Sequence, residues 1–297
     1  MKKAKAFLQL MRPANIITAI SDVLAGIAIS GILFSQSFDT NEWRCIVLLC
    51  ISTMGLYGGG VVLNDVFDAE LDKIERPERP ISRGDIRINE AAALGIVLLL
   101  IGVAASFLCN TYSGIVAGVI SFAAVVYDKW GKHHLILGPV NMGLCRGLNL
   151  LLGISILTTQ LSQWWALAFI PIIYIASITM ISRGEVYGGS KNLLYAASFF
   201  YILVIASILY FAIINKNGIY FAVVFLLLFA WMIFNPLIKA IQQPTGKNIG
   251  KAVKAGVIGL ILMNASWASA FNAIYFAIII VLLLPISIGL GKMFAVT

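Results

Sequence analysis

Long apolar runs alternate with short polar connections along the whole chain. About 20 mostly apolar residues are enough for a helix to cross a bilayer. The runs predict ten such helices, near residues 14–34, 43–63, 91–109, 112–127, 136–157, 163–182, 193–214, 218–238, 252–269 and 272–291. The fourth run is short and the ninth contains Asn264, Ser266 and Ser269, so nine or ten crossings are expected. No long polar insertion interrupts them, which predicts a single all-α membrane domain over residues 1–297.

The composition supports the bilayer as the solvent of this chain. Of 297 residues, 60% are hydrophobic and only 11% are charged, whereas soluble domains carry about 25% charged residues. These values exclude a disordered chain and an ordinary soluble domain. The four cysteines match no zinc or redox spacing and are interpreted as small buried hydrophobic residues: Cys45, Cys50, Cys109 and Cys145.

The basic residues predict how the chain lies in the membrane. If all ten runs cross, 18 of the 21 lysines and arginines fall on one face, Arg44 and Lys216 fall on the other, and Arg146 lies within a span. Basic residues gather on the cytoplasmic side of membrane proteins. The net charge of +8 therefore indicates a multi-pass protein of the inner or cytoplasmic membrane with its N-terminus in the cytoplasm. No nucleic-acid partner is expected.

The acidic residues gather in one connection of that same face. Eight of the thirteen lie between residues 64 and 90, in the longest polar stretch of the chain: Asp65, Asp68, Glu70, Asp72, Glu75, Glu78, Asp85 and Glu90. An ordinary cytoplasmic loop is basic or mixed. A carboxylate cluster at the mouth of a helix bundle indicates a divalent cation.

The first part of this connection has the spacing of one helical face. Asn64, Asp68 and Asp72 follow one another at i, i+4 and i+8, and Asp65 flanks them. Their oxygens are hard ligands, and no histidine or cysteine accompanies them, which favours Mg²⁺ over zinc or copper. Because Mg²⁺ often shares its remaining coordination sites with substrate phosphates, cationic side chains are expected nearby.

Four arginines follow directly, and they carry the planar fork that suits phosphate oxygens: Arg76, Arg79, Arg83 and Arg87. Pro77 and Pro80 separate them and predict that the helix ends and the segment folds into a loop. The alternative is a solvated charged loop whose acids and bases pair with each other.

Together these residues resemble the UbiA superfamily of membrane prenyltransferases. The resemblance rests on Asn64-Asp65-x-x-Asp68-x-x-x-Asp72, on Arg79-Pro80-Ile81-Ser82-Arg83-Gly84, on Arg12-Pro13 before the first span, and on the stretch Tyr127-Asp128-Lys129-Trp130-Gly131-Lys132. The stretches 58–64 and 138–147 are similar to the UbiA-like subgroup called EboC.

The resemblance implies a multi-helix bundle around a central cavity, in which two aspartate-rich loops hold Mg²⁺ ions that bind a prenyl diphosphate. By position, Asn64, Asp68 and Asp72 would be metal and diphosphate ligands, supported by Asp65. The implied diphosphate contacts are Arg79, Arg83 and Lys129 or Lys132, and Tyr127 would face the cavity. The implied partners are the donor, a hydrophobic acceptor and membrane lipid.

The second aspartate motif of that family is degenerate here. In the segment 181–191 only Glu185 remains as an acid, while Arg183 and Lys191 add positive charge. Either Glu185 and the diphosphate bind a second Mg²⁺ weakly, or cationic side chains replace that ion. The leading hypothesis is Mg²⁺-dependent isoprenoid transfer to a hydrophobic acceptor. The alternative is a non-enzymatic protein that binds or transports a lipid or metabolite.

Two charges fall within predicted spans. Arg146 lies about ten residues into the fifth run and Asp22 lies in the first. A charge at the bilayer centre costs roughly 2.5–3.5 kcal/mol on insertion scales, so each is expected to face the cavity and a partner. Arg146, with Asn141 and Asn149 nearby on the same helix, is either a substrate contact or one half of an internal ion pair.

Overall fold

The computed structural model describes residues 2–34, 39–131, 134, 137–185, 188–216 and 218–294, and within them every regular element is helical. The helices are α1 (Lys2–Met11), α2 (Pro13–Ser30), α3 (Thr40–Phe67), α4 (Ala69–Glu75), α5 (Ile88–Cys109), α6 (Thr111–Lys129), α7 (Leu137–Ile154), α8 (Thr158–Trp164), α9 (Phe169–Ser182), α10 (Lys191–Asn215), α11 (Ile219–Gln242), α12 (Gly246–Ala270) and α13 (Ile274–Met293).

The predicted membrane bundle is confirmed. Across the described part of the chain, nine segments are long and apolar enough to cross a membrane, with α8 and α9 counted together as one. The remaining predicted segment corresponds to α7, which carries Arg146 and packs against α2, α6 and α9. The short fourth run became a helix of 19 residues and the polar ninth run one of 25. The ninth keeps its length because its polar side chains face protein, and Asn264, Ser266 and Ser269 are all buried.

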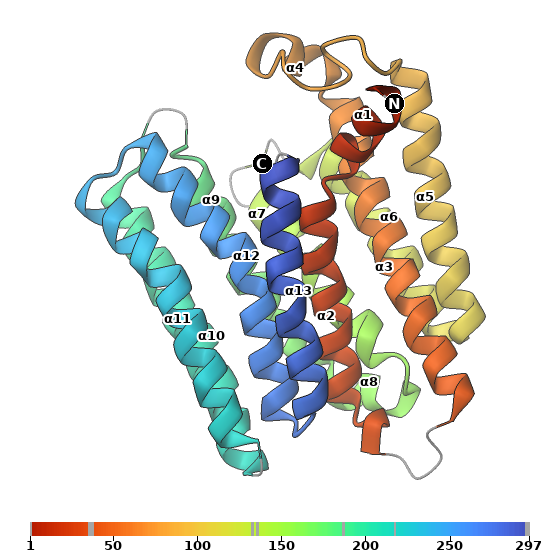
Figure 1. Ribbon diagram of the computed structural model, residues 1–297, viewed down its shortest axis with the longest axis vertical. Helices are drawn as coiled ribbons and strands as arrows, with labels where there is room; N and C mark the ends of the chain where they lie inside the picture. The colour runs from red at the N-terminus through yellow and green to blue at the C-terminus, as the bar shows by residue number, and fades with distance from the viewer. Residues whose placement is uncertain are drawn as a thin grey trace.

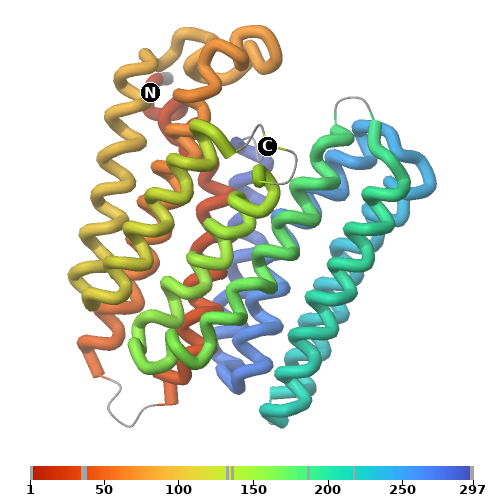
Figure 2. Tube along the Cα trace, turned by 180° about the vertical axis from the view of Figure 1, so that it is seen from behind, coloured from red at the N-terminus to blue at the C-terminus, as the bar shows by residue number. Residues whose placement is uncertain are grey.

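Two helices form the centre of the bundle. In the apolar windows of α2 and α12, 83% and 72% of the residues are buried, whereas the corresponding share is 28% for α5, α10 and α11 and 22% for α13. Figures 1 and 2 show the long helices running side by side, with α1, α4 and the end of α13 at the same end of the molecule. We call this end the α4 end.

A close approach of α2 and α7 brings the two charges within the spans together. A Cβ added to Gly26 of α2 would lie 2.2 Å from the backbone oxygen of Leu150, and one added to Gly153 of α7 would lie 2.1 Å from that of Val23. Because both positions lack a side chain, the two backbones touch. Asp22 lies one turn before Gly26, and Arg146 lies two turns before Gly153. The two side chains therefore face each other across the same helix contact.

The expected continuous helical face of the acidic segment is interrupted at Asp68. The helix α3 ends at Phe67, Asp68 has φ −89° and ψ 0°, and α4 begins at Ala69. Asn64 and Asp72 therefore lie on different helices. The end of α4 at Glu75, just before Pro77, confirms the predicted helix end. The loop between α4 and α5 contains Gly84, whose φ of +78° suits a residue without a side chain.

Candidate active site

A cavity of about 340 Å³ lies between α2, α3, α6, α7, α9 and α12. Its middle is apolar and is lined by Ile120, Ile175, Ile178, Val257 and Leu260. Polar side chains line it at two levels. Toward the α4 end they are Arg12, Asn64, Arg76, Asp128 and Glu185, and further into the bundle they are Thr53, Tyr57, Arg146 and Asn149. The cavity thus joins a charged mouth to an apolar interior with one further polar region inside.

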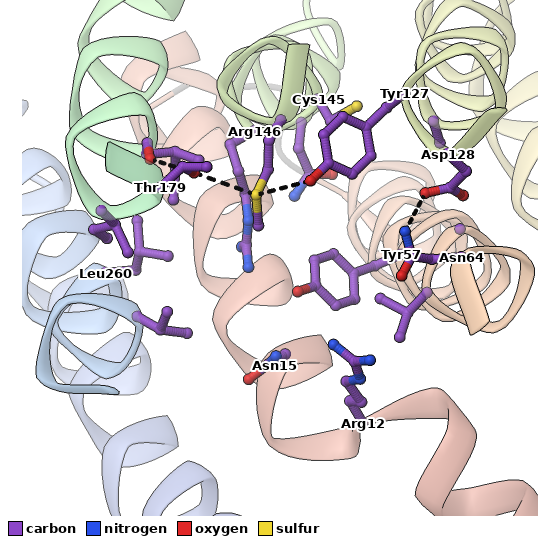
Figure 3. Close-up of a pocket in the computed structure, with 18 of the residues that line it drawn as sticks. Arg12, Asn15, Tyr57, Asn64, Tyr127, Asp128, Cys145, Arg146, Thr179 and Leu260 are labelled. Carbon is purple, nitrogen blue, oxygen red and sulfur yellow. Dashed lines mark hydrogen bonds between the residues drawn. The ribbon is translucent and has the colours of Figure 1, made fainter. Parts of the chain in front are cut away.

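At the mouth, Asn64 and Asp128 form a pair across α3 and α6. The Asn64 amide Nδ2 donates to Asp128 Oδ1 over 2.9 Å, as Figure 3 shows, and Asp128 is 3% exposed. The bond fixes the amide so that its oxygen is available as an acceptor or ligand. Sequence reasoning did not select Asp128. Its position in the last turn of a spanning helix, next to Tyr127, was the signal that would have found it.

Glu185 also reaches the mouth, from the loop that follows α9. Burial raises the pKa of its carboxyl group, and the nearby Arg76 charge lowers it. Arg76 itself lines the same end of the cavity. Glu185, the only acid of segment 181–191, therefore lines the site, and an arginine of the first acidic connection lies close to it.

Arginine side chains form hydrogen-bonded ion pairs with Asp65 and Asp72 of the first acidic motif. Asp65 Oδ1 accepts from Arg12 Nη2 over 2.9 Å and from Arg79 Nη1 over 3.0 Å, and the same Arg79 nitrogen donates to Asp72 Oδ2 over 2.6 Å. We call Arg12, Asp65, Asp72 and Arg79 the surface cluster. It ties the start of α2 to α3 and α4. The alternative in which acids and bases of this segment pair with each other is therefore realised for Asp65 and Asp72.

Other predicted site residues lie away from the cavity wall. Arg83 pairs with Asp85 on the surface, and Lys129 lies over the Trp130 ring at 4.6 Å from its centroid. Three more lie outside the lining as well, namely Asn141, Arg183 and Lys191, of which the last two are exposed. Lys132 lies outside the described residues. Tyr127 does line the cavity, and its hydroxyl lies 3.9 Å from Met142 Sδ.

Further inside, Arg146 is both internally paired and open to the cavity. Its Nη1 donates to Asp22 Oδ2 over 2.7 Å and its Nη2 to Thr18 Oγ1 over 2.8 Å. Its guanidinium carbon lies 4.7 Å from the centroid of the Tyr57 ring. Figure 3 shows this side chain pointing into the cavity toward Tyr57. The two sequence-based alternatives for Arg146 are therefore compatible in one geometry.

Amide and hydroxyl groups complete this network. Asn264 Nδ2 donates to Asp22 Oδ1 over 2.7 Å, Asn149 Nδ2 lies 3.3 Å from Asp22 Oδ2, and Thr53 Oγ1 donates to Asn149 Oδ1 over 2.8 Å. We call the whole set the membrane cluster, and its members are Thr18, Asp22, Thr53, Arg146, Asn149 and Asn264. Tyr57, beside it, was missed from the sequence, although it precedes Asn64 by seven residues and so lies on the same face of α3.

The oxygen-bearing side chains of the mouth suit a metal ion only together with a ligand. Within the described ranges, no three His, Cys, Asp or Glu side chains gather closely enough to hold one by themselves. The mouth nevertheless offers hard oxygens, from Asn64, Asp128 and Glu185 among the described residues. Mg²⁺ keeps several waters and binds through one or two carboxylates together with substrate phosphates. The residues present therefore fit an ion that arrives with a phosphate-bearing ligand.

The fold and the site define a membrane-embedded helical bundle with an internal cavity open to a charged mouth. Residues 24–252 match the UbiA prenyltransferase family, and the chain belongs to that family of enzymes. It is 30% identical over 202 residues to digeranylgeranylglyceryl phosphate synthase of Sulfurisphaera tokodaii, covering 64% of this chain and 68% of that protein. It is 33% identical over 177 residues to the protein of the same name from Saccharolobus solfataricus, covering 60% of each.

The chain thus spans between 52% and 68% of the curated relatives that it matches. Two solved structures show the same fold. A UbiA homologue from Aeropyrum pernix has a TM-score of 0.69 at 16% identity, covering 84% of this chain and 96% of that one. A UbiA homologue from Archaeoglobus fulgidus bound to GPP and Mg²⁺ has a TM-score of 0.62 at 15% identity, covering 86% and 99%. The EboC subgroup stays a prediction.

Proposed function

We propose that this protein transfers an isoprenoid from a prenyl diphosphate to a hydrophobic acceptor within the membrane and that it requires Mg²⁺. The observation that carries the proposal is the cavity that joins the oxygen-bearing side chains of Asn64, Asp128 and Glu185 to an apolar interior. The names of the relatives support prenyl transfer, and the homologue bound to GPP and Mg²⁺ supports the donor and the ion.

In this proposal the mouth binds the diphosphate and the metal. Asn64 and Glu185 line the mouth and would hold Mg²⁺ together with Asp68, which lies one turn beyond Asn64 and outside the cavity lining. Asp128 would orient Asn64 through their hydrogen bond. The ion would supply positive charge that stabilises the departing diphosphate. Arg79 contributes in two ways. It would contact the diphosphate, and the turn of its guanidinium would release Asp72 as a further oxygen ligand, whereas Asp65 would stay paired with Arg12.

The interior handles the carbon part of the reaction. The apolar wall of Ile120, Ile175 and Ile178 excludes water, which would otherwise add to the allylic cation. An aromatic face stabilises a nearby cation by about 0.5–2 kcal/mol. Because Arg146 already covers one face of Tyr57, Tyr127 is the aromatic residue assigned to this role.

Several further assignments belong to this proposal. Residues 1–297 form one domain, with the α4 end in the cytoplasm and the protein in the inner or cytoplasmic membrane. Lys129, Arg183 and Lys191 are exposed on the described part of the chain, and they remain proposed contacts for the incoming diphosphate, as does Lys132.

The test uses purified protein in detergent with a radiolabelled prenyl diphosphate, Mg²⁺ and a membrane-lipid extract as acceptor source. Asp68→Asn and Asp128→Asn are each expected to lower turnover by roughly 100-fold, the effect of losing one electrostatic group at a transition state. Glu70→Gln, which alters an exposed carboxyl of α4, is the control and is expected to keep full turnover.

The outcome also separates the proposal from the non-enzymatic alternative. A binding or transport protein would neither transfer nor hydrolyse the labelled donor, and its ligand would stay bound after Mg²⁺ is chelated. If label is neither transferred nor hydrolysed, and neither substitution changes diphosphate binding, the transferase proposal is wrong.

A further inference from the structure

The membrane cluster is a built polar site within an apolar bundle. Arg146 is 5% exposed and Asp22 is 1% exposed, so their charges are removed from water and meet each other at 2.7 Å. Both carboxylate oxygens of Asp22 accept hydrogen bonds, from Arg146 and Asn264. The remaining members, Asn149 and the two threonines, carry no charge. The cluster therefore has no net charge at the depth where it lies.

One side of this neutral cluster opens on the cavity. A guanidinium has five N–H donors. Asp22 and Thr18 each accept from one nitrogen of Arg146, and the Tyr57 hydroxyl accepts a further hydrogen bond from the guanidinium, so its own O–H stays a donor toward the cavity. Arg146, Asn149 and Tyr57 all line the cavity, and Figure 3 shows the Tyr57 hydroxyl directed toward the Arg146 side chain. A ligand at this level therefore meets polar hydrogens on a surface whose positive charge is already neutralised.

The charge balance decides which ligands fit. A phosphate or carboxylate moved out of water needs a counter-charge, or its burial costs several kcal/mol. Asp22 already satisfies Arg146, and it would also repel an added anion. An uncharged hydroxyl or carbonyl oxygen needs only hydrogen bonds, which the Arg146 and Tyr57 side chains offer. The mouth differs, because Arg12 and Arg76 line it together with the oxygen-bearing Asn64, Asp128 and Glu185, and there the proposed Mg²⁺ would supply the counter-charge of an anion.

We propose that Arg146 and Tyr57 form the acceptor subsite and that they select an acceptor whose buried polar group is an uncharged oxygen, a hydroxyl or a carbonyl. The inference rests on the proposed transferase function and deepens it, because it assigns the second substrate to a place in the cavity two turns of α3 from Asn64. Arg146 and Tyr57 are then specificity-determining residues, and Asp22 is the positioning residue that sets the charge.

The first test compares acceptors that differ only in charge. The probes are a 1-O-alkylglycerol with its 3-phosphate, and an alkylphenol with the corresponding hydroxybenzoate, each added to protein saturated with a non-ionisable prenyl thiolodiphosphate and Mg²⁺. Binding is measured by native mass spectrometry. The uncharged member of a pair is expected to bind at least about 10-fold more tightly. Tighter binding of a charged member, or binding of no probe, overturns the inference.

The second test assigns the selectivity to the named residues. Tyr57→Phe keeps the ring beneath Arg146 and removes only the hydroxyl, and it is expected to weaken the uncharged probe by about fivefold. The double variant Asp22→Asn with Arg146→Gln keeps the cluster neutral and removes the guanidinium, and it is expected to weaken the probe by about 10-fold or more. Tyr220→Phe, at a tyrosine that is 81% exposed, is the control.

A readout of the donor separates this inference from the proposed function. Release of diphosphate from a labelled donor measures the reaction at the mouth, whereas the acceptor KM measures acceptor binding at the subsite. If diphosphate is released but both variants leave the acceptor KM unchanged, the subsite is wrong and the transferase remains. If no diphosphate is released while the uncharged probes bind through Arg146 and Tyr57, the subsite stands and the transferase is wrong.

Discussion

The surface cluster and the membrane cluster both pair aspartate with arginine, but they differ in their access to water. The Arg12 and Arg79 side chains are 18% and 12% exposed, whereas those of Arg146 and Asp22 are 6% and 1% exposed. The carboxylates of the surface cluster are themselves buried, since the Asp65 and Asp72 side chains are 5% and 6% exposed, so this cluster meets water through its arginines. The surface cluster shares one Arg79 nitrogen between two carboxylates. In the membrane cluster, Arg146 uses separate nitrogens for Asp22 and Thr18, and each Asp22 oxygen has its own donor.

This difference indicates how each cluster works. The arginines of the surface cluster keep some access to water, which replaces part of a lost contact, so Arg79 is the partner that we expect to exchange toward an incoming anion, while Asp65 and Asp72 stay buried. A buried pair has no such replacement, and losing one partner leaves an uncompensated charge. The surface cluster is therefore suited to binding and release, and the membrane cluster to a fixed shape and a fixed charge.

The largest effect is expected from breaking the membrane cluster. Arg146→Met removes the cation but keeps a side chain of similar length, and it leaves Asp22 charged and buried. The expected loss is about 3–5 kcal/mol in the free energy of unfolding. Thermal or denaturant unfolding in a mild detergent, followed by tryptophan fluorescence, measures it.

The control for this prediction restores neutrality. Adding Asp22→Asn to Arg146→Met removes the stranded charge and keeps a side chain that hydrogen-bonds to Asn264, so most of the lost stability is expected to return. If the single variant is as stable as the wild type, the buried ion pair does not govern the stability of α2 and α7 and the comparison fails.

A smaller effect is expected at the surface cluster, and Mg²⁺ is expected to oppose it. Arg79→Met removes the bridge between Asp65 and Asp72 and is expected to cost about 1–3 kcal/mol. Asp72 then loses its arginine and becomes available as an oxygen ligand, while Asp65 keeps Arg12, so millimolar Mg²⁺ is expected to stabilise this variant more than the wild type, by mass action. Arg83→Met breaks an exposed pair with Asp85 and is the matched control, for which no additional Mg²⁺ stabilisation is expected. Equal Mg²⁺ responses in both variants would contradict the prediction.

The sequence was sufficient for the fold because apolar runs of spanning length leave few alternatives. It also identified Asp22 and Arg146 as charges in need of partners, yet they are 124 residues apart, and only the packing of α2 on α7 at Gly26 and Gly153 brings them together. A periodicity argument treats a helix as continuous, so it did not reveal the break at Asp68.

The sequence pattern predicts which residue types gather at the mouth, but it does not predict which of them pair with each other. Arg79 was interpreted as a phosphate contact, and the sequence alone does not show that it bridges two of the predicted metal ligands. Asp128 was overlooked because it belongs to a different helix from the acidic motif, and its bond to Asn64 spans 64 residues. Long-range pairings of this kind depend on tertiary packing, which one sequence does not encode locally.

The smallest effect is expected at Glu185, which is an intermediate case between the two clusters. Burial raises the pKa of its carboxyl above the usual value of 4.5, and Arg76 opposes that rise. Between 4.5 and the raised pKa, the folded protein holds a proton that the unfolded chain has released. Stability is therefore expected to fall slightly as pH rises through this window, and Glu185→Gln is expected to remove that dependence.

Arg76→Gln provides the complementary change at this site. Without the arginine charge the pKa of Glu185 is expected to rise further, so the window of pH-dependent stability moves to higher pH. Unfolding midpoints of the wild type, Glu185→Gln and Arg76→Gln between about pH 4 and pH 7 measure the shift, with Glu75→Gln as an exposed-carboxyl control. A wild-type profile identical to that of Glu185→Gln would mean that the carboxyl is solvated rather than held at the mouth. The effect of burial on stability, which is expected to decrease from Arg146 through Arg79 to Glu185, would then extend only as far as the surface cluster.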